Sequence, residues 1–350
     1  MSSNLIFALF GLALFAYIQL YFLVKLAERV GLLDWPSERK KHLNPTPLVG
    51  GLMLFISLWS ATWVLDFSSK IFWVLTASTP LIFMGLLDDL LGLTVKTRLA
   101  FQILFASVFV LASGQTVHDL GVYALEPSEA AWIGAAIAII AFVGFSNAFN
   151  MIDGLDGLAG ILSLIALLSV SVASLNRSGS IPEWEFISAL AVVLFLFVLV
   201  NLSLTPLPRI FLGDAGSMFL GFVIVWMYIN LSQSPEASVN PLVCLWSAAI
   251  PVFDLCVTTG KRMIQGDSPF VGDRRHIHYL LIDRGCSNRL ALLLICCFAL
   301  LCAICGTILD AYMPAKISAL SFISVFFLYV LVTSSYCLNY IFGYNSNADS

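Results

Sequence analysis

The feature that most constrains this chain is a series of long apolar runs separated by short clusters of charged residues and glycines. A helix needs roughly 17 to 25 residues to cross a hydrocarbon core of about 30 Å, and eleven runs are close to that length. They cover 4–24, 48–66, 71–87, 99–113, 130–146, 158–175, 186–204, 215–231, 242–258, 290–309 and 317–340. The sequence therefore predicts an all-α polytopic membrane protein with about 11 transmembrane helices.

The composition supports a membrane protein. Hydrophobic residues make up 60% of the chain and charged residues 11%, with a mean hydropathy of +0.95, whereas about 25% of a globular domain is charged. The first run has no basic residue before it and is longer than a signal-peptide core, so we expect it to stay as a span. Residues 1–342 are expected to form one integral membrane domain and 343–350 a short cytoplasmic tail.

The basic residues predict the orientation of the chain. Threading the runs in order places most of the 17 Lys and Arg residues on one face of the membrane. The positive-inside rule makes that face cytoplasmic, with the N-terminus outside the cell and the C-terminus inside. A basic inner surface suits anionic membrane lipids and anionic soluble substrates. No basic run exceeds three residues, so a nucleic-acid partner is not indicated.

The same threading brings four polar clusters to the cytoplasmic face. Each interrupts an apolar stretch at a predicted membrane boundary, and the four are Asp88-Asp89, Asn147 to Gly157, Gly213 to Ser217, and His276-Ile277-His278. Clusters that share one side of a multi-span protein can form one polar site. We therefore expect a single active site built from cytoplasmic loops.

Asp88 and Asp89 stand together at the end of an apolar run. Adjacent carboxylates repel each other, and a divalent cation between them and a phosphate would relieve that repulsion. The alternative is a solvated helix end, because Asp near the membrane interface costs little free energy. Lys96 and Arg98 open the next run and are candidates for holding phosphate oxygens.

The second cluster combines side-chain amides and acids with glycines. Four polar side chains recur at steps of three, namely Asn147, Asn150, Asp153 and Asp156. Gly154 and Gly157 predict a helix break at which the backbone can approach a ligand closely. Irregular backbone at membrane depth is tolerated where protein buries it or water lines it, which favours a polar pocket over a purely structural break.

Asp214 stands at the predicted N-terminus of a span, among small residues. Free N–H groups and the helix dipole favour anions there. One interpretation has Asp214 holding Mg²⁺ while nearby N–H groups hold a diphosphate. The other makes Asp214 a simple helix N-cap.

His276 and His278 follow Arg274 and Arg275, and they are two of four histidines in the chain. A spacing of two places both side chains on one face of an extended loop. The alternatives are a basic head-group anchor or packing of the loop. A zinc site is disfavoured because no third His or Cys stands at a suitable spacing.

Two further polar groups leave their roles open. Asp254 lies in an apolar span with Lys261 seven residues on, so it is either functional or paired with Lys261 or Arg262. His42 ends a basic stretch in the first inner loop, where a juxtamembrane anchor and a substrate contact are equally compatible with the sequence.

Taken in order, these motifs resemble the polyprenyl-phosphate N-acetylhexosamine-1-phosphate transferase family, most of all its undecaprenyl-phosphate N-acetylglucosamine-1-phosphate transferase branch. The matching segments are Pro47 to Gly51, Asp88-Asp89, Val95 to Arg98, Asn147 to Gly157, Phe211 to Ser217, Ile250 to Asp254, and Asp273 to His278. Two segments depart from the branch. Tyr279 stands where a third His is usual, and Leu90 to Gly92 replace an Arg and a further Asp.

The resemblance implies transfer of N-acetylglucosamine 1-phosphate from UDP-GlcNAc to undecaprenyl phosphate, giving undecaprenyl-diphospho-GlcNAc and UMP. Such a product would initiate a surface polysaccharide such as O antigen or enterobacterial common antigen. The resemblance also implies a homodimer, and Mg²⁺ or Mn²⁺ held by Asp214 and Asn150. The catalytic candidates are Asp88, Asp89, Asp153, Asp156, His276 and His278, and the substrate-binding candidates are His42, Lys96, Arg98, Asn147, Asn150, Arg274 and Arg275.

Some alternatives stay open at this point. Asp88 or Asp89 would either activate the lipid phosphate or attack directly in a two-step route. The donor could be another UDP-sugar, UDP-GalNAc or UDP-MurNAc-pentapeptide. A transporter of an anionic solute would place polar residues near the bilayer midplane and show inverted halves, whereas a silent lipid-binding scaffold would have no turnover.

Overall fold

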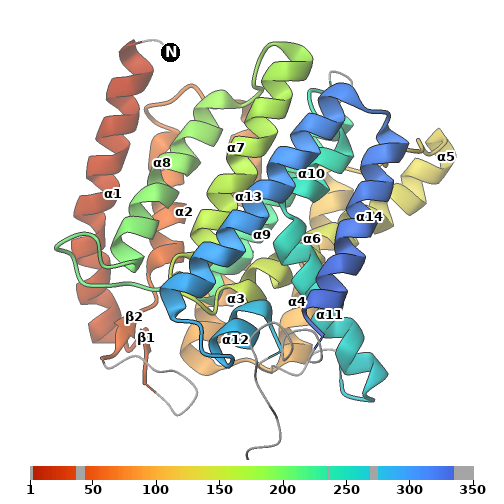
Figure 1. Ribbon diagram of the computed structural model, residues 1–350. Coiled ribbons are helices and arrows are strands. Elements are labelled where there is room, and N and C mark those ends of the chain that lie inside the picture. The colour runs from red at the N-terminus through yellow and green to blue at the C-terminus, as the bar shows by residue number, and fades with distance from the viewer. Residues whose placement is uncertain (1–2, 37–43, 235–236, 269–274, 335–350) are drawn as a thin grey trace, which may run out of the picture.

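The computed structural model describes residues 3–36, 44–234, 237–268 and 275–334. Long helices run side by side through the molecule (Figure 1). The helices are α1 Ser3–Val30, α2 Gly50–Ala61, α3 Ser69–Leu91, α4 Val95–Ser113, α5 Pro127–Glu129, α6 Ala135–Ile152, α7 Leu158–Ser178, α8 Trp184–Asn201, α9 Gly213–Gln233, α10 Pro241–Ser247, α11 Ala249–Ile264, α12 Ile277–Ile282, α13 Asn288–Tyr312 and α14 Ala315–Val332. A π-helical turn, Ala130–Gly134, joins α5 to α6, and strands β1 Leu33–Asp34 and β2 Thr46–Pro47 pair antiparallel.

The all-α multi-pass class is confirmed, and the described residues hold slightly fewer candidate spans than the roughly eleven predicted. Nine described helices are long and apolar enough to cross a membrane, or ten with the bent pair α10–α11. The predicted span 48–66 contains the 12-residue helix α2, which at 1.5 Å per residue reaches about 18 Å. The run 317–340 overlaps most of α14 and then extends past the described residues, and the predicted tail 343–350 lies outside them.

The bend between α10 and α11 has a local cause. The two helices meet at an angle of 76°. Pro251 lies in the first turn of α11 and has no N–H to donate to the carbonyl of Ser247, so a continuous helix would lack that hydrogen bond. The break therefore falls within the predicted span 242–258, and its two halves point in different directions.

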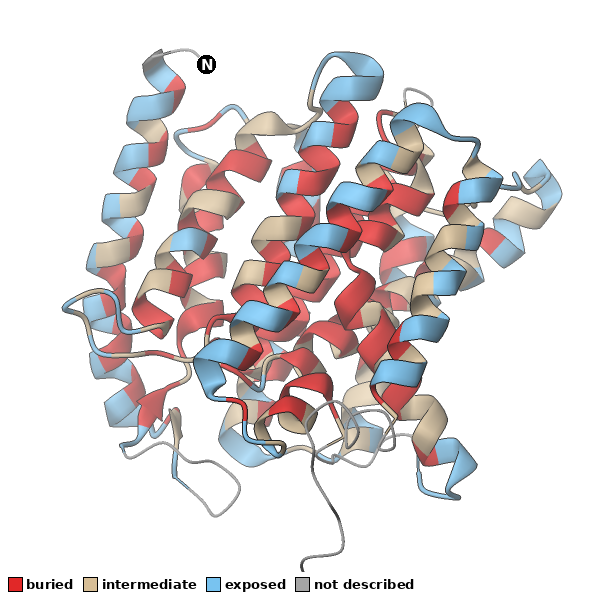
Figure 2. Cartoon of the chain, in the orientation of Figure 1, coloured by how far each residue is buried: buried red, intermediate tan, exposed pale blue. Residues whose placement is uncertain are grey.

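Helix α9 forms the centre of the bundle. It is buried along nearly its whole length and packs against α3, α6 and α2. The ring of Phe222 lies 5.0 Å from those of Phe109 and Phe142, centroid to centroid. Figure 2 shows buried positions in the middle of the bundle and exposed positions along the outer faces of α1, α13 and α14, whose exposed apolar residues suit contact with lipid.

Glycines let the neighbouring backbones approach the start of α9. A Cβ atom at Gly85 would collide with the backbone of Ala215, and one at Gly51 would collide with the backbone of Gly216. Small residues are used in this way between membrane helices, where close packing replaces the hydrophobic effect. As a result, the C-terminal end of α3 lies directly against the N-terminal end of α9.

The connecting loops that carry the polar clusters meet at one end of the bundle. In Figure 1 this is the lower end, where β1, β2 and α12 lie, whereas the N-terminus lies at the upper end. Hydrogen bonds join Asp89 to α9 and Asn150 to Asp214 across this end. The prediction that the polar clusters share one side is thus confirmed.

The close approach at Gly85 yields a stability prediction. We expect Gly85→Ala to lower the free energy of unfolding by about 1–3 kcal/mol, because the added methyl group forces α3 away from α9. Gly144→Ala is the matched control, since a Cβ atom there meets open space and alanine favours the helix by up to about 1 kcal/mol. Thermal unfolding of the two variants in detergent would measure the difference, and equal unfolding temperatures would refute the packing argument.

Candidate active site

Arg98 holds two of the predicted acids together. Its Nη1 atom lies 2.8 Å from Oδ2 of Asp88 and 3.3 Å from Oδ2 of Asp214. The other oxygen of Asp88 accepts a hydrogen bond of 2.8 Å from the N–H of Leu93. Asp88 is buried, so the Arg98 guanidinium supplies the positive charge that a buried carboxylate requires.

Asp89 caps the N-terminus of α9. Its Oδ1 atom accepts a hydrogen bond of 2.9 Å from the N–H of Asp214, and its Oδ2 atom one of 3.3 Å from the N–H of Ala215. Gly213 has a φ of +74°, and a Cβ atom there would lie 2.7 Å from Asp89 Oδ2. The expectation that these N–H groups are open to a diphosphate is corrected, because the Asp89 carboxylate occupies them. Asp214 is also not the N-cap, since α9 begins one residue earlier.

The two predicted asparagines occupy different surroundings. Asn150 Nδ2 donates to Asp214 Oδ1 at 2.7 Å and to Ser217 Oγ at 3.0 Å. Asn147 Nδ2 donates instead to Gln102 Oε1 at 2.7 Å and to the Val143 carbonyl at 2.8 Å. Asn150 therefore belongs to the acid cluster, whereas Asn147 links α6 to α4.

The helix break predicted at the second cluster is present. Helix α6 ends at Ile152 and α7 begins at Leu158. Between them, Asp156 Oδ2 lies 3.1 Å from Arg209 Nη1, and the Arg209 guanidinium covers the ring of Phe211 at 4.8 Å. This second Arg–Asp pair ties the break to the loop that precedes α9.

Asp153 lies among the negative charges of this cluster. Burial raises the pKa of its carboxyl well above the ordinary value of 3.8, and the negative charges of Asp214, Asp156 and Asp89 raise it further. An added positive charge in the cluster would oppose this rise. The acids therefore form a place where a cation is electrostatically favoured.

Asn201 joins two of the predicted loops, and the sequence analysis missed it. Its Oδ1 atom accepts a hydrogen bond of 2.5 Å from the N–H of Gly157, and its Nδ2 donates at 2.7 Å to the Ile210 carbonyl. Gly157 has a φ of +77°, which glycine adopts without strain. One feature of the sequence could have indicated this role: Asn201 is an amide at the end of an apolar helix, and a buried side-chain amide requires hydrogen-bond partners.

The histidine segment is held by Asp254. His276 Nδ1 lies 2.6 Å from Asp254 Oδ2, and the N–H of Ile277 donates to Asp254 Oδ1 at 2.9 Å. Lys261, one of the two basic partners considered for Asp254, donates instead to the Thr333 carbonyl at 2.9 Å. Asp254 and His276 are both buried, so this pair fixes the start of α12.

His278 reaches the acid loop from the same segment. Its ring is fully buried and lies parallel to that of His276, with centroids 5.8 Å apart. A Cβ atom at Gly154 would collide with Nε2 of His278, so glycine permits this contact. Tyr279, the departure from the expected third histidine, packs on the His278 ring at 4.1 Å.

The remaining candidates lie further out. Lys96 is exposed at the start of α4. Arg275 Nη2 lies 2.8 Å from Asp267 Oδ2 in a partly exposed pair. His42 and Arg274 fall outside the described residues.

The acid cluster fits a cation that also binds substrate phosphates. In the described part of the chain, no three His, Cys, Asp or Glu side chains are arranged to hold a metal ion on their own. Mg²⁺ is usually bound by one or two carboxylates together with water and substrate phosphates. Asp214 and Asn150, whose side chains already touch, supply oxygen donors of that kind.

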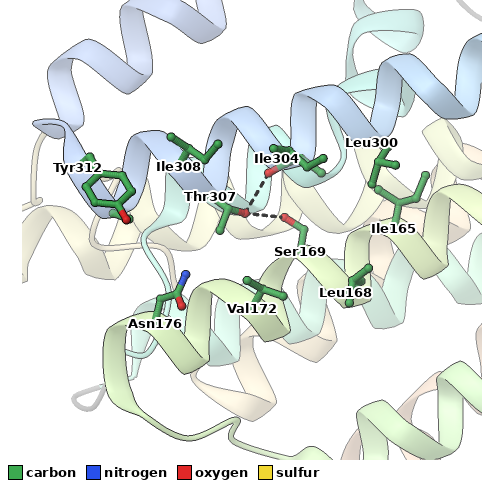
Figure 3. Close-up of a pocket in the computed structure, with 12 residues that line it drawn as sticks. Ile165, Leu168, Ser169, Val172, Asn176, Leu300, Ile304, Thr307, Ile308 and Tyr312 are labelled. Carbon is green, nitrogen blue, oxygen red and sulfur yellow. Dashed lines mark hydrogen bonds between the residues drawn. The ribbon is translucent and has the colours of Figure 1, made fainter.

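A large cavity lies away from these residues. It has a volume of about 650 Å³ between α7 and α13, and Figure 3 shows its mostly apolar walls, with Ser169 and Thr307 hydrogen-bonded across it at 3.4 Å. None of the acids or histidines of the polar cluster line it. Cavity size alone therefore does not mark the site.

The position of Asn201 yields a second stability prediction. We expect Asn201→Leu to lower the free energy of unfolding by about 2 kcal/mol or more, because the N–H of Gly157 and the Ile210 carbonyl lose their partner. Asn176→Leu is the control, since Asn176 is exposed on α7. Thermal unfolding would compare the two, and an equally stable Asn201 variant would contradict the bridging role.

The raised pKa of Asp153 yields a pH-dependent prediction. The folded protein binds the Asp153 proton more tightly than the unfolded chain, so ionisation of this group costs stability as the pH rises above about 3.8. Asp153→Asn should therefore unfold at a higher temperature than the wild type at pH 8 in EDTA, and the gain should shrink toward pH 4. A variant less stable than the wild type at pH 8 would contradict this electrostatic account.

Comparison with known proteins agrees with this arrangement. Residues 71–232 match the family described as glycosyl transferase family 4. The undecaprenyl-phosphate alpha-N-acetylglucosaminyl 1-phosphate transferase of Yersinia pestis is 33% identical over 97% of this chain and 91% of its own length. The proteins of that name in Escherichia coli K12 and Haemophilus influenzae are 30% and 31% identical, over 94% and 90% of this chain and 90% of their own lengths. The chain belongs to glycosyl transferase family 4, as a multi-pass membrane enzyme of the polyprenyl-phosphate sugar-1-phosphate transferase type that its motifs resemble.

Proposed function

We propose that this chain transfers N-acetylglucosamine 1-phosphate from UDP-GlcNAc to undecaprenyl phosphate, giving undecaprenyl-diphospho-GlcNAc and UMP. The observation that carries the proposal is the gathering of Asp88, Arg98, Asn150 and Asp214 into one polar cluster at the end of the membrane bundle. A site there can receive a soluble nucleotide from water and a lipid phosphate from the bilayer. The names of the similar proteins support this choice of donor and acceptor.

The chemistry needs positioning and charge neutralisation more than covalent help from the protein. Asp214 and Asn150 would hold Mg²⁺, with Mn²⁺ as the alternative, and the bound ion would neutralise the diphosphate of the donor. Arg98 would exchange its longer contact, the one to Asp214 at 3.3 Å, for a phosphate oxygen while it keeps Asp88. Lys96, exposed at the start of α4, would meet the phosphates as they enter.

The carboxylates of the cluster would have different roles. Asp89 would keep the N-terminus of α9 in place, because both of its oxygens accept backbone hydrogen bonds. Asp88 would act at the lipid phosphate, either by activating it or by direct attack. Asp153 and Asp156 would orient the nucleotide or assist the ion, and Arg209 would hold Asp156 in place.

The histidine segment would bind the sugar phosphate. His278 lies buried against Gly154 in the acid loop, so its ring would support the backbone on which the substrate binds. Arg274 and Arg275 precede it and would add positive charge, and His42 would approach from the first inner loop. Asn147, hydrogen-bonded to Gln102, would support this wall of the site.

The cellular setting follows from the charge distribution and the substrates. The polar end would face the cytoplasm of a bacterial inner membrane, because the basic loops gather there and nucleotide sugars are soluble. The N-terminus would then be periplasmic and the C-terminus cytoplasmic. The product would initiate a surface polysaccharide such as O antigen or enterobacterial common antigen, and the enzyme would work among anionic membrane lipids as a homodimer.

The reaction itself is the direct test. Purified protein in detergent would receive undecaprenyl phosphate, Mg²⁺ or EDTA, and each of three radiolabelled donors: UDP-GlcNAc, UDP-GalNAc and UDP-MurNAc-pentapeptide. We expect label to enter organic solvent from UDP-GlcNAc, with release of an equal amount of UMP and loss of both signals in EDTA. Label from another donor alone would overturn the choice of sugar, and folded protein without turnover on any donor would favour the transporter or scaffold.

The assignment of Asp214 as a metal ligand can be tested with a variant. We expect Asp214→Asn to lower turnover about 100-fold or more and to raise the Mg²⁺ concentration that it requires, because one charged oxygen ligand is lost. Asp119→Asn is the control, since Asp119 lies in the loop between α4 and α5, at the opposite end of the bundle. Normal Mg²⁺-dependent turnover by folded Asp214→Asn protein would show that the ion binds elsewhere.

A further inference from the structure

Helix α14 buries few of its side chains in the bundle. Of its residues Ala315–Val332, all within the described chain, only Ser318 and Tyr329 are buried. Lipid tails are as apolar as the side chains that face them, so exposed apolar residues do not hold a membrane helix in place. The polar contacts of Ser318 and Tyr329 therefore hold α14 in place together with the half-buried rings of Phe322 and Phe326, which pack on Trp246 and Phe253.

Both buried side chains bind the bent helix pair. Trp246 Nε1, in α10, donates to Ser318 Oγ at 3.1 Å. The Tyr329 hydroxyl donates to Asp254 Oδ1, in α11, at 3.0 Å. Just beyond α14, the Thr333 carbonyl accepts from Lys261 Nζ at 2.9 Å. One lipid-facing helix thus holds both sides of a 76° break.

The carboxylate that Tyr329 binds also holds the histidine segment. Asp254 accepts from Tyr329 and from the N–H of Ile277 on Oδ1, and it lies 2.6 Å from His276 Nδ1 on Oδ2. The three side chains are 3% (Asp254), 4% (Tyr329) and 5% (His276) exposed. Hydrogen bonds are strong in such a setting, and a lost partner is costly.

The His276 ring is held at both of its nitrogens. The Asp254 carboxylate lies beside Nδ1, and Arg262 Nη2 lies 3.5 Å from Nε2, on the other side of the ring. The ring of His276 is therefore fixed from both sides, and the ring of His278 lies parallel to it.

We propose that Tyr329 is a positioning residue for the active site, whose hydroxyl orients the Asp254 carboxylate and thereby the segment that carries His276 and His278. The proposal rests on the transferase function proposed above. It assigns to α14 a part in catalysis, although this helix contributes no side chain to the acid cluster. Tyr329 acts through Asp254 and is not itself part of the acid cluster.

The contribution of the Tyr329 hydroxyl can be measured separately from that of its ring. The Tyr329 ring packs on Phe253 and Phe298, with centroids 5.6 Å and 6.4 Å away, and Tyr329→Phe keeps this packing. Tyr312→Phe is the matched control, because Tyr312 is exposed at the end of α13. A change found in the first variant and not in the second therefore belongs to the buried hydroxyl.

Turnover of the purified variants is the first measurement. We expect Tyr329→Phe to lower kcat about ten-fold, Tyr312→Phe to match the wild type, and Asp254→Asn to lower kcat further. Because Tyr329 acts through Asp254, the double variant should be no slower than Asp254→Asn alone. Wild-type kcat in folded Tyr329→Phe protein, or losses that multiply in the double variant, would overturn the proposal.

Amide hydrogen exchange, measured by mass spectrometry on the full-length protein, gives a second readout that needs no turnover. We expect Tyr329→Phe to speed exchange in 276–282 and to leave 158–178 unchanged. Asp254→Asn should have the same effect, and it provides the test if Tyr329→Phe fails to fold. Unchanged exchange in 276–282 would refute the positioning role. If the wild type transferred no sugar phosphate, the proposed function would fail while this exchange result still stood.

Discussion

The structure depends on how the N-terminus of α9 is satisfied. A helix that begins inside a membrane protein exposes N–H groups without partners, and leaving them unpaired in an apolar surrounding is costly. Asp89 supplies the acceptors from α3, and the backbone contacts at Gly85 and Gly51 bring α3 and α2 close enough for this to happen. The most buried helix of the bundle is thus fixed by a carboxylate from the candidate active site. Fold and site share one set of contacts, so a change in either disturbs the other.

The sequence predicted the parts that follow from local composition. Long apolar runs became helices, the glycines at 154 and 157 ended one helix and began another, and the polar clusters met at one end of the bundle. The length of α2 was missed because the residues after Ala61 are still apolar, although the helix ends there. Hydropathy reports which segments avoid water, and it does not report where a helix stops.

The side-chain partners could not be read from the sequence. Asp89 and the N–H of Asp214 are 125 residues apart in the chain, and Gly157 and Asn201 are 44 apart. Each pair depends on how two helices slide and rotate against each other, which many small packing contacts decide together. Arg98 was grouped with the phosphate-binding candidates by its position in the chain. Its contacts with Asp88 and Asp214 could be found only from the structure. Whether these residues have their proposed catalytic roles stays a prediction.

The charges of the cluster bear on how a substrate would enter. Arg98 and Arg209 each lie beside carboxylates that already engage them, and Asp153 lies among the remaining negative charges. The acids would repel a bare diphosphate. A divalent cation bound to the diphosphate would bring positive charge to a site where burial strengthens its attraction to the carboxylates. The same entry would loosen the longer contact between Arg98 and Asp214 and free a guanidinium for the phosphates. If the proposed function holds, these contacts would favour a nucleotide and its cation arriving as one unit.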